Sequence, residues 1–148
     1  MEQALLVTAR ALAKVPGAKA LVIFGHGFGR LGLVGLGGLP TGVSFDREYG
    51  QARDLFMSGR TAVYCLDTTR AAAHSLEAGL RQVAADTGGF FVRTNDFPGA
   101  AMRRLGEALA GRYEIAVEKP ALPPGEHRIT VELVGRKGLV LARRSYVG

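Results

Sequence analysis

Short apolar segments alternate with helical patterns through the first 110 residues, and this alternation limits the possible folds more than any other feature. The apolar segments span residues 20–24, 61–66 and 90–94, and each is short enough to be a buried strand. The helical patterns around them place apolar residues three or four positions apart: Leu5, Ala9 and Leu12; Tyr49, Ala52 and Phe56; Leu76, Leu80, Val83 and Ala84; Met102, Leu105 and Leu109. Strands alternating with helices predict a three-layer, Rossmann-like α/β fold in which helices cover both faces of a parallel sheet.

The pattern changes after Gly111. The stretches "YEIAVEK", "HRITVELV" and "LVLARRSYV" alternate apolar with polar residues, and proline and glycine separate them. Such alternation is typical of half-buried antiparallel strands. We therefore expect an α/β region over residues 1–112 and an antiparallel β extension over 113–148, packed on the same domain.

Length and charge exclude several classes of protein. A chain of 148 residues has the length of one domain, and with 47% apolar residues it can bury a core. The net charge of +6 is spread along the chain, and its densest group (Arg136, Lys137, Arg143 and Arg144) lacks any nucleic-acid motif. We expect no nucleic-acid partner.

We expect neither an export signal nor a membrane span, because residues 1–148 show no basic segment followed by an apolar run and no apolar run of sufficient length. The cellular compartment is left open. The single cysteine, Cys65, excludes an internal disulfide and a zinc site built from several cysteines.

A glycine-rich stretch over residues 25–42 follows the first apolar segment, and we expect a long loop there. Gly27, Gly29 and Gly32 match the dinucleotide pattern G-x-G-x-x-G. That pattern needs a helix beginning at the loop to hold the pyrophosphate. The glycines and the proline that follow disfavour a helix, so we expect no dinucleotide and no other cofactor.

The same stretch offers an alternative function. His26-Gly27-Phe28-Gly29 resembles the H-G-x-G oxyanion loop of α/β-hydrolases. Such an enzyme needs a G-x-S-x-G nucleophile turn, and the nearest candidate, around Ser44, lacks the last glycine. His74 and His127 then have no nucleophile to activate. The sequence favours a protein without catalytic activity, and a hydrolase and a small-molecule site at the strand ends remain as alternatives.

A wider resemblance covers nearly the whole chain. The segments "VTARALAKVPGAKALVIFGHG", "AVYCLDTT", "LRQVAADTGGFFVRTND", "YEIAVEKP", "HRITVEL" and "RRSY" occur in an order that resembles the second half of a von Willebrand factor type A domain. The chain is most similar to the bacterial VWFA-related group that is abundant in Acidobacteria and often exported. The resemblance implies a partial type A fold that binds a protein ligand or has a structural role.

Type A domains commonly bind their ligands through a metal ion at the carboxyl ends of the strands. The family's site combines an Asp-x-Ser-x-Ser loop, a threonine and an aspartate. The position of that aspartate falls at His26 here, and the other two elements belong to the first half of the domain. Imidazole is a poor ligand for Mg²⁺, which prefers oxygen. We expect a degenerate site without a metal, and we interpret Asp67 and Asp96 as solvated carboxylates that cap turns or helices.

The predicted parallel sheet and the resemblance together indicate where a partner binds. If the sheet is parallel, His26, Asp67 and Asn95 should converge at its carboxyl edge, the usual binding side of open α/β sheets. Phe28 and Arg30 would reach the partner from the glycine-rich loop above. The strand over residues 20–24 should lie at the edge of the sheet and pair with another chain. We therefore expect a homodimer or a complex with a chain that supplies the first half of the domain.

Overall fold

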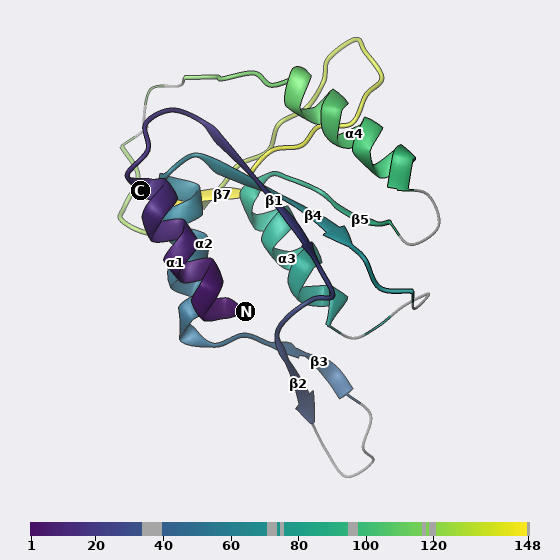
Figure 1. Ribbon diagram of the computed structural model, residues 1–148. Coiled ribbons are helices and arrows are strands. Elements are labelled where there is room, and N and C mark those ends of the chain that lie inside the picture. The colour runs from purple at the N-terminus through teal and green to yellow at the C-terminus, as the bar shows by residue number, and fades with distance from the viewer. Residues whose placement is uncertain are drawn as a thin grey trace.

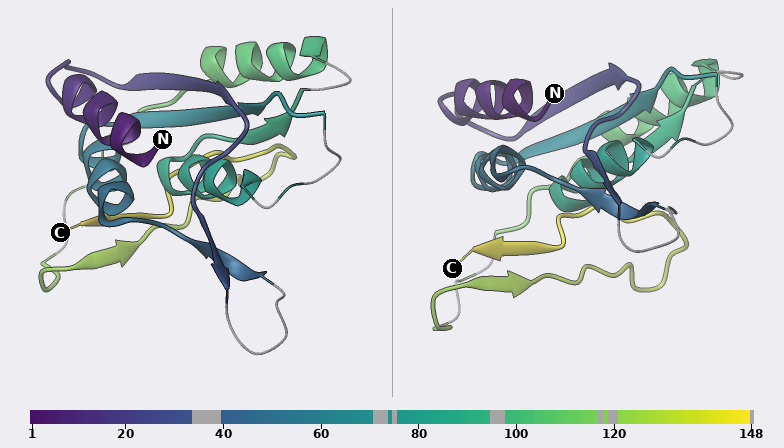
Figure 2. Two further views of the ribbon diagram at one scale, coloured as in Figure 1. Left: turned by 60° about the horizontal axis from the view of Figure 1, so that its bottom comes forward. Right: turned by 90° about the horizontal axis from the view of Figure 1, so that it is seen from below.

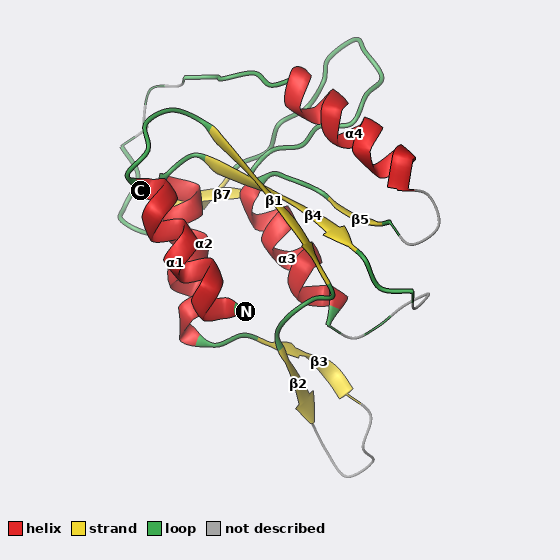
Figure 3. Ribbon diagram, viewed as in Figure 1, coloured by secondary structure: helices red, strands yellow, loops and turns green. Residues whose placement is uncertain are grey.

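The computed structural model describes residues 1–33, 40–70, 74, 76–94, 98–116, 118 and 121–147, with only the backbone for 30–33, 40–44 and 147. Figures 1 and 3 show the elements along the chain. The helices are α1 (Glu2–Ala13), α2 (Arg47–Ser58), α3 (Glu77–Thr87) and α4 (Pro98–Ala110). The strands are β1 (Lys19–Gly25), β2 (Arg30–Leu33), β3 (Pro40–Ser44), β4 (Thr61–Asp67), β5 (Phe91–Arg93), β6 (Glu126–Arg128) and β7 (Ser145–Val147).

Three of these strands form the parallel sheet predicted from the sequence. Their order is β1-β4-β5, and both pairs are parallel. Thr61 pairs with Lys19 at one end of β4, and Asp67 pairs with Gly25 and Arg93 at the other. The fold is therefore mixed α/β with the character of a partial Rossmann-like fold.

Helices cover both faces of the sheet, which gives the predicted layers (Figure 2). Val63 and Cys65 of β4 face the larger core, which contains buried residues of α1, α2 and α3. Tyr64, between them, faces the smaller core formed with Phe90 and with Leu105 of α4. Side chains of one strand alternate between two faces, so an uninterrupted apolar strand is suited to a sheet buried on both sides.

The glycine-rich stretch differs from the long loop expected. β2 and β3 pair in an antiparallel hairpin in which Gly32 lies opposite Gly42. Glycine has no side chain that could produce a strand periodicity, so the sequence carries no pattern that would indicate this pairing. The ladder supplies hydrogen-bond partners to a backbone that would otherwise need water.

The antiparallel extension is confirmed in part. β6 pairs with β7, with His127 opposite Tyr146, and the guanidinium of Arg143 donates to the carbonyl oxygen of Met57 in α2 at 3.1 Å. The strands expected in "YEIAVEK", "HRITVELV" and "LVLARRSYV" are wrong for residues 113–116, 129–134 and 139–144, which have no regular structure. Tyr113 is 90% exposed there. Alternation of apolar and polar residues is therefore not enough to form a strand where no other strand pairs with the segment.

Among the described residues, we find no helix that combines the length and apolar character needed to cross a membrane.

Candidate functional site

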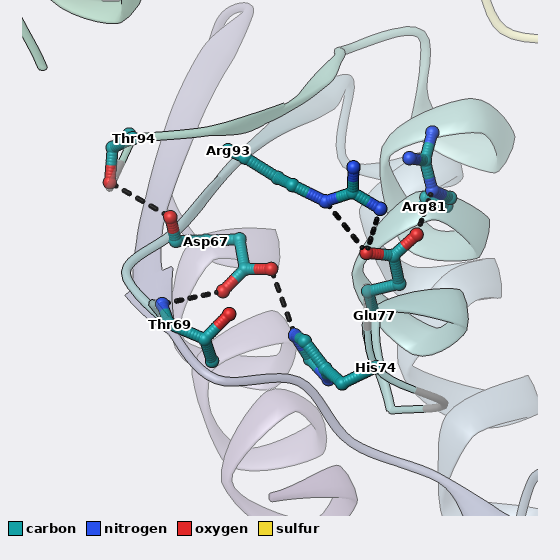
Figure 4. A network of polar contacts seen from close by, with 7 residues as sticks. All are labelled: Asp67, Thr69, His74, Glu77, Arg81, Arg93 and Thr94. Atoms are coloured by element: carbon teal, nitrogen blue, oxygen red, sulfur yellow. Dashed lines mark hydrogen bonds and ion pairs between the residues drawn. The ribbon is translucent and has the colours of Figure 1, made fainter. Parts of the chain in front are cut away.

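The carboxyl ends of β1, β4 and β5 meet at one edge of the sheet, where the sequence predicted a binding face. Gly25, Asp67 and Arg93 are aligned there by the strand register. Parallel strands bring their ends together in this way, so polar residues distant in the sequence become neighbours. Figure 4 shows the resulting network around Asp67.

Asp67 is the centre of this network, and its interpretation as a solvated carboxylate is wrong. The residue is 0% exposed. Its Oδ1 accepts a hydrogen bond from the backbone N–H of Thr69 at 2.9 Å, and its Oδ2 lies 2.8 Å from Nε2 of His74. Its carbonyl oxygen accepts from both the N–H and the hydroxyl of Thr94 at 2.8 Å. The side chain does cap a turn, as expected, but inside the protein.

The environment keeps Asp67 ionised. Burial alone would raise the pKa of this carboxyl, but the N–H of Thr69 and the ring of His74 outweigh burial and hold the pKa below its usual value. Since an ionised carboxylate only accepts hydrogen bonds, Nε2 of His74 carries the proton in this contact.

Sequence reasoning did not place His74 in the site. It appeared there only as a histidine without a nucleophile, and nothing in a spacing of seven residues from Asp67 indicates a contact. The carbonyl oxygen of His74 accepts a hydrogen bond from the backbone N–H of Glu77, which ties His74 to the start of α3. From this position the imidazole contacts Asp67.

Glu77 adds a second carboxylate at the first position of α3. Its Oε2 accepts from Nε and Nη2 of Arg93 at 3.0 and 2.7 Å, and its Oε1 accepts from Nε of Arg81 at 3.0 Å. Burial would raise the pKa of Glu77, but the two arginines lower it overall. Sequence analysis missed this residue, although an acidic residue four positions before an arginine is a recognisable helix pair.

Three potential metal ligands converge in this network. One ligand atom each from Asp67, His74 and Glu77 lies within 4.8 Å of the others. The hydroxyl oxygen of Thr69 is buried beside them, close enough to the carboxyl of Asp67 to help lower its pKa, but it makes no hydrogen bond of normal geometry. Carboxylate oxygen, imidazole nitrogen and hydroxyl oxygen are all groups that can bind a cation.

Of the other residues of the predicted partner-binding face, His26 and Phe28 lie outside the Asp67 network in the described part of the chain. His26 is exposed and follows Gly25 at the end of β1. Arg30 begins β2, and its side chain lies outside the described part of the chain, as does all of Asn95. Since Asp67 is buried, it cannot contact a partner directly in this conformation.

Phe28 is also placed differently from the prediction. It is 4% exposed, and its ring lies 5.9 Å from the ring of Phe45 and 6.0 Å from that of Tyr49. The expectation of an exposed Phe28 on a flexible loop is wrong, because an aromatic ring gains more from burial among other rings than from exposure to water.

The oxyanion loop proposed for a hydrolase is engaged within the protein. The N–H of Phe28 donates to the carbonyl oxygen of Leu76 at 3.1 Å. Gly27 has φ of +110°, and a Cβ there would lie 2.3 Å from the same oxygen. The close approach explains the glycine, and it leaves the Phe28 amide unavailable to an oxyanion.

A second candidate surface is the outer side of β1. Among the described strands β1 has only β4 as a neighbour, and each of its seven residues is exposed or half-buried, in contrast to β4. Phe24 is 60% exposed. An apolar parallel strand is normally covered, so this edge is an unusual exposed surface.

The comparisons with known proteins found no matching family model, and no curated protein or solved structure with significant similarity to the chain.

Proposed function

We propose that this protein is a non-catalytic protein-binding module that associates through the outer edge of β1, and that its partner is a second copy of the same chain. The observation that carries the proposal is the apolar strand β1 at one edge of the parallel sheet, whose residues are exposed or half-buried. Unpaired N–H and C=O groups along such an edge are a template for another strand.

The hydrogen bonds of β1 identify which of its residues would pair. The N–H of Lys19 donates to the carbonyl oxygen of Arg60, and the carbonyl oxygen of Gly25 accepts from the N–H of Thr68. Lys19 and Gly25 therefore direct their backbone groups toward β4. Successive residues of a strand point their backbone groups to opposite sides, so those directed outward belong to Ala20, Val22 and Phe24.

This edge lacks the devices by which proteins usually prevent strand pairing. β1 contains neither proline nor a bulge, and its only charged residue is Lys19 at the start. The ammonium group of Lys19 donates to the carbonyl oxygens of Val15 and Gly17, which holds it away from the rest of the strand. Charged side chains and prolines protect natural sheet edges, and residues 20–24 have none.

A two-fold axis gives the simplest arrangement. Two β1 strands paired antiparallel about an axis at Val22 would place Val22 opposite its own copy and Ala20 opposite Phe24. All three residues direct their N–H and C=O groups outward, so each pair would be of the hydrogen-bonded type. The same surface is then used by both copies, and the assembly closes at two.

Proline substitutions test this edge with little change to the monomer. We expect the wild-type protein to be a dimer by light scattering at micromolar concentration. The double variant Ala20→Pro and Phe24→Pro removes two outward N–H groups, leaves the ladder with β4 intact and replaces two exposed side chains. It should be a monomer.

The matched control is Ala20→Thr with Phe24→Thr, which changes the same side chains but keeps both N–H groups. It should remain a dimer, and circular dichroism should show both variants folded. A monomeric wild-type protein, or a folded proline variant that is still a dimer, would refute pairing through β1. A monomer that forms a complex with a separate polypeptide would show that the partner is another chain.

A further inference from the structure

The network around Asp67 has no part in pairing at β1, and it combines features that ordinary buried ion pairs lack. It contains two carboxylates, an imidazole that contacts one of them, and a buried hydroxyl that makes no hydrogen bond of normal geometry. Buried polar atoms are nearly always satisfied, so the Thr69 hydroxyl needs an explanation. A bound cation would provide one.

We propose that Asp67, His74 and Glu77 form a binding site for Zn²⁺. Each contributes one ligand atom, and the three atoms lie within 4.8 Å of one another. Ligands bound to zinc at about 2.0–2.2 Å are roughly 3–4 Å apart in a tetrahedron, so small side-chain movements bring these atoms into range. The fourth ligand of the tetrahedral zinc ion would be the Thr69 hydroxyl or a water molecule.

The donor set selects the metal. One imidazole nitrogen with two carboxylate oxygens suits a borderline ion such as Zn²⁺, whereas Mg²⁺ prefers oxygen ligands in octahedral geometry. Zinc would take the place of the proton that Nε2 of His74 directs toward Asp67, and the neutral ring would then carry its proton on Nδ1. The site uses residues that follow β4 and begin α3, and it does not include His26.

The two arginines limit how tightly the ion is held. Arg81 and Arg93 fix the carboxylate of Glu77 by hydrogen bonds, as residues behind metal ligands commonly do. Their charges also balance that of Glu77 when the ion is absent, so we expect the chain to fold without zinc. We therefore expect reversible binding that is weaker than in structural zinc sites made of cysteines.

Calorimetric titration of the tag-free full chain with zinc chloride tests the proposal. We expect one zinc ion per chain and a zinc-dependent rise in melting temperature, since a ligand that binds only the native state stabilises it. Titration with magnesium chloride should give neither effect. X-ray absorption of the zinc-loaded protein should show a single nitrogen ligand among oxygen ligands.

Variants distinguish this site from other histidines. His74→Gln and Glu77→Gln should each weaken zinc binding at least tenfold. His26→Gln and His127→Gln, which change an exposed and a half-buried histidine outside the network, should bind as the wild type does. Melting curves without metal establish that each variant is folded. Absence of zinc binding by the wild type, or binding that both His74→Gln and Glu77→Gln leave unchanged, would overturn the proposal.

Discussion

Cys65 shows how burial determines the chemistry of a single residue. Its side chain lies inside β4, it is 0% exposed, and burial raises the pKa of its thiol to about 12. Only the thiolate is a good nucleophile, so the thiol should be unreactive in the folded protein. We expect iodoacetamide to leave native protein unmodified at pH 8 and to modify it fully in guanidinium chloride. Rapid modification of the native protein would contradict the burial of β4.

The same pKa predicts a dependence of stability on pH. A thiol with a pKa near 8.5 when unfolded and about 12 when folded keeps its proton in the native state while the unfolded chain loses it. The contribution to stability is complete below pH 8.5 and is lost as pH rises toward 12, by up to about 1.4 kcal/mol per pH unit. Urea unfolding between pH 8 and 10.5 should show a shallower decline in Cys65→Ala than in the wild type. Identical slopes would argue against the raised pKa.

Phe28 and Phe24 form a matched pair of phenylalanines, one buried and one exposed. Replacing Phe28 by alanine removes a ring packed against Phe45 and Tyr49, so we expect a loss of about 3–5 kcal/mol in the free energy of unfolding. Phe24→Ala should change it by less than about 1 kcal/mol at concentrations where the protein is monomeric. Denaturant unfolding of the two variants measures the difference, and similar losses would contradict the placement of Phe28.

A site residue could be predicted from the sequence only where it directly follows an apolar segment that is recognisable as a strand. Asp67 was found because it ends an apolar strand, and parallel strands place such residues at the binding edge of a sheet. His74 and Glu77 were not found, because their approach to Asp67 depends on the path between β4 and α3. Burial of Asp67 and Phe28 could not be inferred either, since a carboxylate and an aromatic ring beside glycines are equally compatible with exposure.

At the scale of elements, the close contact of α3 with β4 depends on glycine. A Cβ on Gly89 would lie 1.9 Å from the carbonyl oxygen of Val63, which is backbone and cannot move alone. Gly106 lies on α4 with nothing within 4 Å of a Cβ. We expect Gly89→Ala to lower the free energy of unfolding by about 3 kcal/mol or more. Gly106→Ala should raise it by about 1 kcal/mol, because alanine favours helix.

Thermal or denaturant unfolding of the two glycine variants provides the measurement. Both substitutions add one methyl group, so the comparison isolates the space available at each position. A Gly89→Ala protein as stable as the wild type would mean that the turn between α3 and β5 is not packed against β4 as the structure has it.

Elements with a clear periodicity were predicted, and those without one were not. The four helices and three parallel strands follow from apolar spacing, which reflects the burial of one helix face or of both strand faces. The β2–β3 hairpin was missed because its glycines show no alternation. The segment 113–116 has the alternation but is not a strand, since pairing depends on tertiary contacts that the local sequence does not contain.

At the scale of the molecule, the three-stranded sheet is covered by α1, α2 and α3 on one face and by α4 on the other, but β1 is left at its edge (Figure 2). Pairing of two such edges would join both sheets into one and cover Phe24. The Asp67 network lies at the carboxyl ends of the same strands, so zinc binding and self-association can be measured separately in one protein.

Hydrogen exchange of the β1 amides, followed by NMR at several protein concentrations, tests the central claim of pairing through this strand most directly. The amides of Leu21 and Ile23 face β4, by the alternation from Lys19, and should be protected at every concentration. Those of Ala20, Val22 and Phe24 face outward and should become protected only as the dimer forms. Outward amides that exchange rapidly in a dimer, or that are already protected in a monomer, would contradict the proposed pairing.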